Sequence, residues 1–135
     1  MSHYTTLATR ITDPEALCGA LADLGYGDVE VHDQPQPLYG FLGDPRGDRA
    51  HVIIRRRHVG RLSNDIGFLR QESGNYLALI SEYDRTKHNE SWLDLVTAKH
   101  AYRVTSKALA GQGFDLVDET VERDGTVRMV LRRFQ

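Results

Sequence analysis

One short segment occurs twice in the sequence, and this repeat constrains the fold more than any other feature. Residues 20–29 (ALADLGYGDV) and residues 108–117 (ALAGQGFDLV) each combine the end of a helix, a glycine, an aromatic residue and the start of a strand. Glycine is favoured directly after a helix because it adopts left-handed backbone conformations without strain. We therefore expect Gly25 and Gly113 to end two helices with a positive φ.

A repeated helix-to-strand corner indicates two similar strand–helix–strand units, residues 4–31 and 76–121. The first helix is expected to start at Pro14, because proline suits the first helical position and Asp13 can accept hydrogen bonds from the free amide groups. The second helix is predicted over residues 90–112. Intervals of three and four residues predict its core-facing stripe, which comprises Trp92, Leu95, Ala98, Tyr102, Thr105 and Leu109.

Alternating and β-branched segments predict strands at residues 4–11, 28–33, 51–59, 65–71, 76–82, 114–121 and 126–134. Ser73–Asn75 and Asp124–Gly125 predict hairpin turns, and residues 44–48 predict a loop. The order of elements predicts an α+β fold: a two-layer sandwich, with a mostly antiparallel sheet, two helices on one face and a possible internal strand–helix–strand duplication. No linker divides the chain, so residues 1–135 are predicted to form a single domain.

The composition is that of a globular protein, with 40% hydrophobic and 27% charged residues. The net charge of −2 argues against a surface that is basic throughout. Cys18 is the only cysteine, which excludes an internal disulfide and suits a small buried apolar residue. No apolar run approaches the ~20 residues that cross a bilayer, and the first residues do not resemble a secretory signal. We expect a cytoplasmic protein with no membrane contact.

Catalytic and cofactor motifs do not stand out in the sequence. The glycines of residues 40–43 lack the lysine and the following helix of a phosphate-binding loop. The histidines do not show the paired spacing of a zinc site; they are His3, His32, His51, His58, His88 and His100. We therefore expect no enzyme activity, no metal and no cofactor.

Two groups of basic residues are candidate binding sites. Lys99, Arg103 and Lys107 recur every four residues on the second helix and are expected to point outward, whereas Arg55 and Arg57 lie at the end of a predicted strand. Such a surface can bind an acidic partner or a nucleic-acid backbone. The same residues also fit a purely structural role, because cations near a helix C-terminus complement its dipole and charges on edge strands prevent aggregation.

Several short motifs, taken in order, resemble one known family: residues 1–6 (MSHYTT), 64–68 (NDIGF), 101–102 (AY), 112–114 (QGF), 124–127 (DGTV) and 132–134 (RRF). The combination resembles the hypothetical chloroplast reading frame thirty-five family over nearly the whole chain. Bacterial members of that family carry a domain of unknown function. The resemblance implies an accessory protein associated with AAA-type ATPases, and it supplies no catalytic residues.

Three functions follow as hypotheses. The first is a non-catalytic accessory or adaptor protein that works with an AAA-type ATPase. The second is a nucleic-acid-binding module that uses the arginine-rich strands, although few aromatic residues lie near them for base stacking. The third is a small-molecule binder, or an enzyme of unknown chemistry, with a pocket between the helices and the sheet. The sequence does not fix the oligomeric state.

Overall fold

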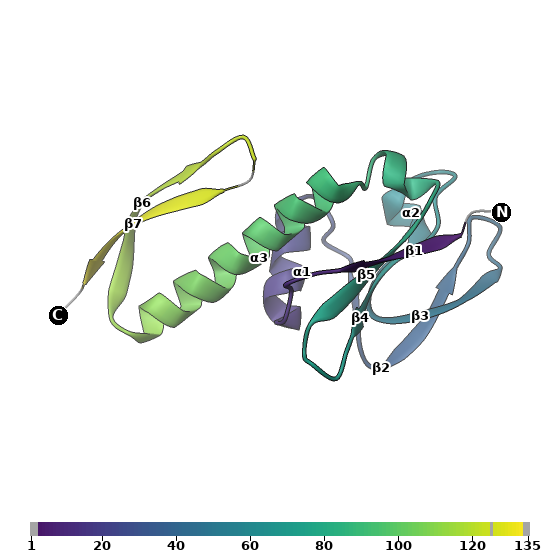
Figure 1. Cartoon of the computed structure of the whole chain (residues 1–135), viewed down its shortest axis with the longest axis horizontal. Helices are drawn as coiled ribbons and strands as arrows, with labels where there is room; N and C mark the ends of the chain where they lie inside the picture. Colours follow the sequence, from purple (N-terminus) through teal and green to yellow (C-terminus); the bar gives the residue numbers. More distant parts are fainter. Residues whose placement is uncertain (1–2, 125, 134–135) are drawn as a thin grey trace.

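The computed structural model describes residues 3–124 and 126–133. Five strands form one antiparallel sheet in the order β1–β5–β4–β3–β2 (Figure 1). Their bounds are Tyr4–Ala8 (β1), Glu30–Tyr39 (β2), Pro45–Ile54 (β3), Ile66–Arg70 (β4) and Tyr76–Ser81 (β5). The helices are α1 (Pro14–Asp23), the short α2 (Arg56–Val59) and α3 (Glu90–Gly111), with a 3-10 turn, η1, at Asp84–Thr86. A separate antiparallel hairpin consists of β6 (Phe114–Val121) and β7 (Val127–Arg133).

Helices α1 and α3 pack together on one face of the five-stranded sheet, as predicted for an α+β sandwich. Successive residues of a strand point to opposite faces, so Val52 and Ile54 of β3 contribute to the main core while Ile53 lies on the other face. Leu17 of α1 and Val96 of α3 belong to the same main core. A smaller apolar cluster covers part of the opposite face and comprises Leu38, Ala50, Ile53 and Leu79.

The ends of α1 follow the predicted capping chemistry. The side chain of Asp13 accepts hydrogen bonds from the amide groups of Glu15 and Ala16, at 2.9 and 3.1 Å. Past the last turn, Gly25 has φ 101°, and Gly113 after α3 has φ 89°. Both glycines therefore occupy the left-handed region, as the repeated segment predicts.

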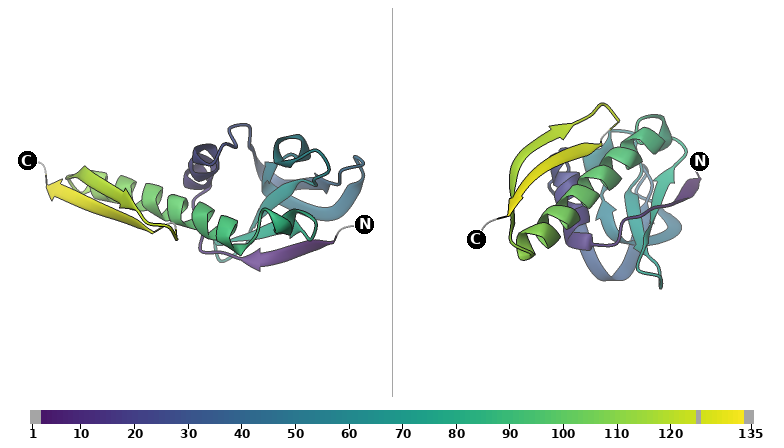
Figure 2. Two further views of the ribbon diagram at one scale, coloured as in Figure 1. Left: turned by 90° about the horizontal axis from the view of Figure 1, so that it is seen from above. Right: turned by 60° about the vertical axis from the view of Figure 1, so that its left-hand side comes forward.

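The predicted core stripe of α3 was wrong, because the buried residues lie on a different face of the helix. The buried residues of α3 are Leu93, Val96 and His100, whereas the residues of the predicted stripe are half-buried or exposed. The C-terminal half of the helix extends beyond the sheet, and the β6–β7 hairpin folds back beside it (Figures 1 and 2). Because the sheet no longer covers this half of the helix, periodicity alone placed the stripe incorrectly.

The strand predicted at residues 51–59 was also wrong at its end. It begins at Pro45, inside the predicted loop, and stops at Ile54, after which residues 56–59 form α2. The carboxylate of Asp65 accepts a hydrogen bond from the backbone N–H of Arg56 at 2.7 Å, so a distant residue satisfies the first free amide of this helix. The prolines at positions 35 and 37 lie in β2, an edge strand, where a missing backbone N–H is tolerated.

The two halves of the predicted duplication share their corner but not the strand that follows. Strand β2 joins the five-stranded sheet, whereas the described part of β6 pairs with β7 alone. Helix α1 has 10 residues and α3 has 22, which corresponds to about 15 and 33 Å. The longer helix carries its strand away from the sheet. Gly125 of the predicted turn and Phe134 at the predicted strand end lie outside the described residues.

Candidate functional site

Three loops meet at the end of the sheet near α2, and a buried polar cluster holds them together. The carboxylate Oδ2 of Asp84 accepts hydrogen bonds from the backbone N–H of Asn64 at 2.9 Å and from the hydroxyl of Ser81 at 2.8 Å. The Asn64 carboxamide in turn accepts from the backbone N–H of Phe41 at 3.2 Å. Asn64, Ser81 and Asp84 are all buried. The loops at residues 40–44, 60–65 and 82–89 therefore have fixed relative positions.

An ion-pair network beside this cluster fixes the same end of β3. The guanidinium of Arg55 donates to both carboxylate oxygens of Glu30, at 2.8 and 2.9 Å, and to Asp65 at 2.8 Å. Asp65 is fully buried and also accepts from the backbone N–H of Tyr39 at 2.7 Å. The hydrogen bonds from Arg55 lower the pKa of Glu30 to about 2. Arg55 is therefore a structural residue, with its charge neutralised inside the protein.

The sequence segment Asn64–Phe68 owes its composition to this arrangement. Asn64 and Asp65 supply the two buried polar centres, and Phe68 lies in the main core. Gly67 lies so close to its neighbours that an added Cβ would be 2.5 Å from the Cβ of Ala50. Ile66 is also part of the main core, so each position of the segment has a packing or hydrogen-bonding reason.

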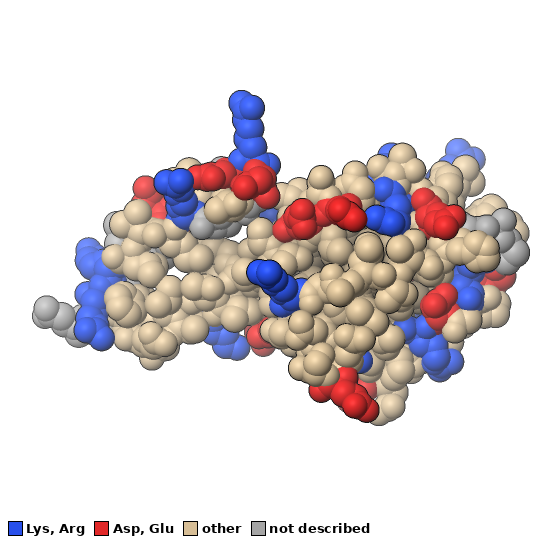
Figure 3. Space-filling view, viewed as in Figure 1, with Lys and Arg blue, Asp and Glu red and all other residues tan. Residues whose placement is uncertain are grey.

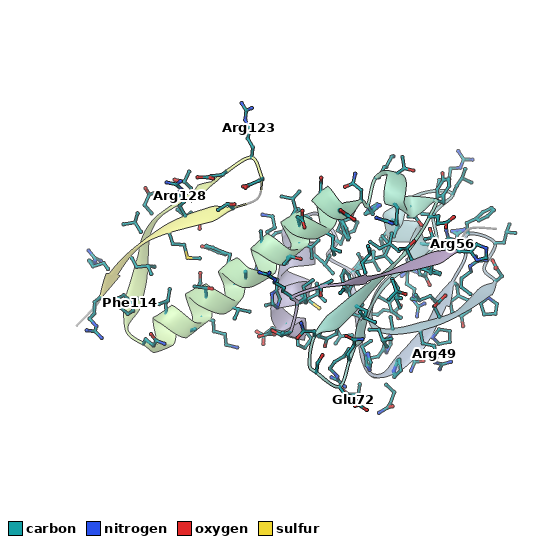
Figure 4. All side chains as sticks on the ribbon, viewed as in Figure 1. Arg49, Arg56, Glu72, Phe114, Arg123 and Arg128 are labelled. Carbon is teal, nitrogen blue, oxygen red and sulfur yellow. The ribbon has the colours of Figure 1, made fainter. Side chains whose placement is uncertain are left out.

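The outer surface of these loops exposes apolar side chains, which we call the loop face: Phe41, Leu42, Leu62 and Tyr83. The exposed fractions of Leu42 and Leu62 are 76% and 55%. Single exposed apolar residues are ordinary, but a group held in fixed positions is typical of an interaction site. The side chains of this end of the sheet surround the labelled Arg56 in Figure 4.

A pocket of about 380 Å³ lies between the segments 59–63 and 83–88, and Leu62 and Tyr83 of the loop face line it. His88 lines it and is itself buried. The ring Nε2 of His88 is 2.7 Å from the hydroxyl of Tyr26, and its ring meets Trp92 edge-on at 4.8 Å between centroids. Burial lowers the pKa of His88, so the ring is neutral at pH 7. The pocket therefore rests on a packed aromatic floor.

The structure separates the residues that the sequence proposed as binding sites. Arg57 is exposed on α2 beside the loop face, unlike its neighbour Arg55. Arg103 and Lys107 of the row on α3 are exposed, as expected, and both lie beside acidic residues of α1. Arg103 forms a two-pronged ion pair with Asp23, at 2.8 and 3.2 Å.

The other two members of that row differ in exposure. Lys107 is exposed, and its Nζ lies 4.0 Å from Oε2 of Glu15. Lys99 is half-buried. A second pocket, of about 330 Å³, lies between the start of α1 and this part of α3. Asp23 and Glu15 of α1 lie beside Arg103 and Lys107. The net positive charge of this surface is therefore smaller than the three basic residues alone would give.

Sequence reasoning did not identify the loop face. Its apolar residues come from three separate loops, so no periodic pattern marks them. The available signal was the presence of Phe41, Leu42 and Leu62 in segments otherwise rich in turn-forming residues, where polar side chains are more common. Only the tertiary structure brings these segments together.

Within residues 3–124 and 126–133, no group of three or more His, Cys, Asp or Glu side chains is placed to hold a metal ion. Cys18 is half-buried against the main core, and burial raises the pKa of its thiol. No helix in the described part of the chain is long and apolar enough to cross a membrane.

Comparison with known proteins agrees with the resemblance noted in the sequence. The structure is that of a small α+β protein with a five-stranded antiparallel sheet and an appended hairpin. The chain belongs to the family described as protein of unknown function (DUF1257), whose model matches residues 20–130. The matched span includes the Gly25 corner and the Asn64–Phe68 segment.

Curated relatives extend over essentially the whole chain. The uncharacterized protein ycf35 of Cyanophora paradoxa is 26% identical over 136 residues, covering 100% of this chain and 99% of its own length. The protein of the same name from Pyropia yezoensis is 24% identical over 135 residues, covering 99% of this chain and 98% of its own length. No solved structure matches the chain.

Proposed function

We propose that this protein is a cytoplasmic, non-catalytic accessory protein that binds another protein through its loop face. An AAA-type ATPase is the proposed partner, on the basis of the family resemblance. The observation that carries the proposal is the group of exposed apolar side chains on loops whose positions are fixed by buried polar residues.

Two physical arguments support a role in protein binding. Exposed apolar side chains lose their contact with water when a partner covers them. The free energy gained is about 25 cal/mol per Å² of apolar surface buried. The hydrogen bonds from Asn64, Ser81 and Asp84 order the loops before binding. Binding then costs less conformational entropy than it would for mobile loops.

Nucleic-acid binding by the arginine-rich strands has less support. Arg55 is neutralised by Glu30 and Asp65, and Arg128 on the hairpin pairs with Glu122 at 2.6 Å. On the face drawn in Figure 3, most of the described lysine and arginine side chains lie among acidic ones, apart from a group at the end of the hairpin. A nucleic-acid backbone favours a continuous basic band.

The test is affinity co-purification of the tagged chain from its native host at near-physiological salt. We expect a specific partner to be retained by the wild type and lost from Leu42→Glu/Leu62→Glu. Val31→Glu is the matched control, because Val31 is 56% exposed on β2 rather than on the loop face. Retention of the partner by the double variant would remove the loop face from the interface. Recovery of the wild type with no partner would contradict the accessory role.

A further inference from the structure

The pocket between residues 59–63 and 83–88 has a fixed floor and a rim that is both apolar and cationic, and these features favour one kind of partner. Its floor is fixed, because the backbone carbonyl of Asp84 accepts from the N–H groups of Lys87 and His88, at 3.2 and 2.7 Å. Asp84 is 4% exposed, and its carboxylate already accepts hydrogen bonds from Asn64 and Ser81. The pocket therefore exists before any ligand binds.

The rim of the pocket combines apolar and cationic side chains. Leu62 and Tyr83 are exposed at 55% and 52%, and the side chains of Arg61 and Lys87 are also exposed. Within the described residues, neither Arg61 nor Lys87 forms an ion pair with an acidic side chain. This contrasts with Arg103, which already has a carboxylate partner. The charge at the rim is therefore available to a ligand.

We infer that the pocket binds a peptide segment of the partner protein in which an apolar side chain is adjacent to an acidic one. The apolar side chain enters between Leu62 and Tyr83, and the carboxylate lies at Arg61 and Lys87. The volume of about 380 Å³ is near the lower end of the range for ligand pockets, which suits one or two side chains. This inference rests on the proposed function, since it specifies the partner chemistry of the same surface.

The first experiment is a phage selection of random peptides, about twelve residues long, against the wild-type chain, with Arg61→Glu/Lys87→Glu as the counter-target. We expect the enriched peptides to carry Asp or Glu beside an apolar residue. A synthetic copy should bind the wild type at least about tenfold more tightly than the variant, and its affinity should fall as salt rises. Amide NMR signals of residues 61–63 and 86–88 should move on binding.

The charge-matched control is Arg10→Glu/Arg123→Glu, because both arginines are exposed and neither lines the pocket. Figure 4 shows Arg123 at the tip of the hairpin, pointing away from the sheet. This variant should bind the peptide within about twofold of the wild type. Enriched peptides without acidic residues, or equal binding to the Arg61/Lys87 variant, would overturn the inference.

Inorganic phosphate is the probe for a small-anion site. If phosphate alone moves the same amide signals with an affinity equal to that of the peptide, the pocket is an anion site and the peptide inference fails. The co-purification assay separates this failure from failure of the proposed function. A partner lost from Leu42→Glu/Leu62→Glu but retained by Arg61→Glu/Lys87→Glu would support the loop face and overturn the peptide inference.

Discussion

The imidazole Nε2 of His100 accepts a hydrogen bond from the backbone N–H of Asp13 at 3.1 Å, across 87 positions of sequence. The same nitrogen accepts from the N–H of Thr12 at 3.3 Å. An accepting nitrogen carries no proton, so the ring is neutral with its proton on Nδ1. A histidine of α3 thereby fixes the chain just before α1.

Acid should weaken this link and destabilise the protein. Burial lowers the pKa of His100 below the usual 6.5 despite the nearby Asp13 carboxylate. The unfolded chain therefore binds a proton more readily than the folded one, and the free energy of unfolding should fall as pH decreases from about 7 to 5. Urea denaturation at both pH values measures this. His51 and His88 are also buried with lowered pKa values and contribute in the same direction.

The variant His100→Gln isolates the contribution of His100, because its amide oxygen can accept a hydrogen bond at any pH. We expect its free energy of unfolding to change less between pH 7 and 5 than that of the wild type. An unchanged pH dependence would show that His100 does not titrate on unfolding. His100→Ala should lose about 1 kcal/mol at pH 7, because two partly buried hydrogen bonds lose their acceptor.

Alanine at the helix-ending glycines should destabilise the protein. Gly25 and Gly113 have φ values of 101° and 89°, where a Cβ strains the backbone. Each Gly→Ala substitution should therefore cost about 1 kcal/mol, measured by thermal or urea denaturation. Gly27→Ala is the control, since Gly27 lacks a positive φ and its added Cβ would meet nothing within 4 Å. Equal effects at Gly25 and Gly27 would refute the strain argument.

Arg55 and Arg57 should behave differently although only one residue separates them. Arg55→Met leaves the buried carboxylate of Asp65 without its cation and should cost about 3 kcal/mol. Arg57→Met should change stability by less than about 0.5 kcal/mol, because Arg57 is exposed. Urea denaturation of both variants provides the measurement. Similar stabilities would mean that the Glu30–Arg55–Asp65 network contributes little.

Reversing the charges on α3 tests the role predicted for that row. Lys99→Glu/Arg103→Glu/Lys107→Glu should fold, but with a loss of up to about 1 kcal/mol, because two of the new carboxylates face Asp23 and Glu15. Adding Asp23→Lys and Glu15→Lys should restore the stability. If the row binds an acidic partner, the triple variant should lose that partner in co-purification, whereas full retention would exclude the row from the interface.

The local signals in the sequence were reliable where a few neighbouring residues decide the conformation. Asp13 with Pro14 specified the start of α1, and Gly25 and Gly113 specified the left-handed ends of two helices. Alternation of apolar residues indicated most strands, and the order of elements indicated the α+β class. These features depend on backbone sterics and on hydrogen bonds within one or two turns of chain.

The tertiary structure decided what depends on contacts between distant segments. The carboxylate of Asp65 satisfies the first amide of α2 and so replaces the end of a predicted strand with a helical turn. The length of α3 carries β6 away from the sheet, which limits the internal repeat to its corner. The loop face exists because Asn64, Ser81 and Asp84 hydrogen-bond across loops that lie up to 20 positions apart. Propensity and periodicity describe neighbours along the chain, whereas this surface depends on which loops the folded sheet brings together.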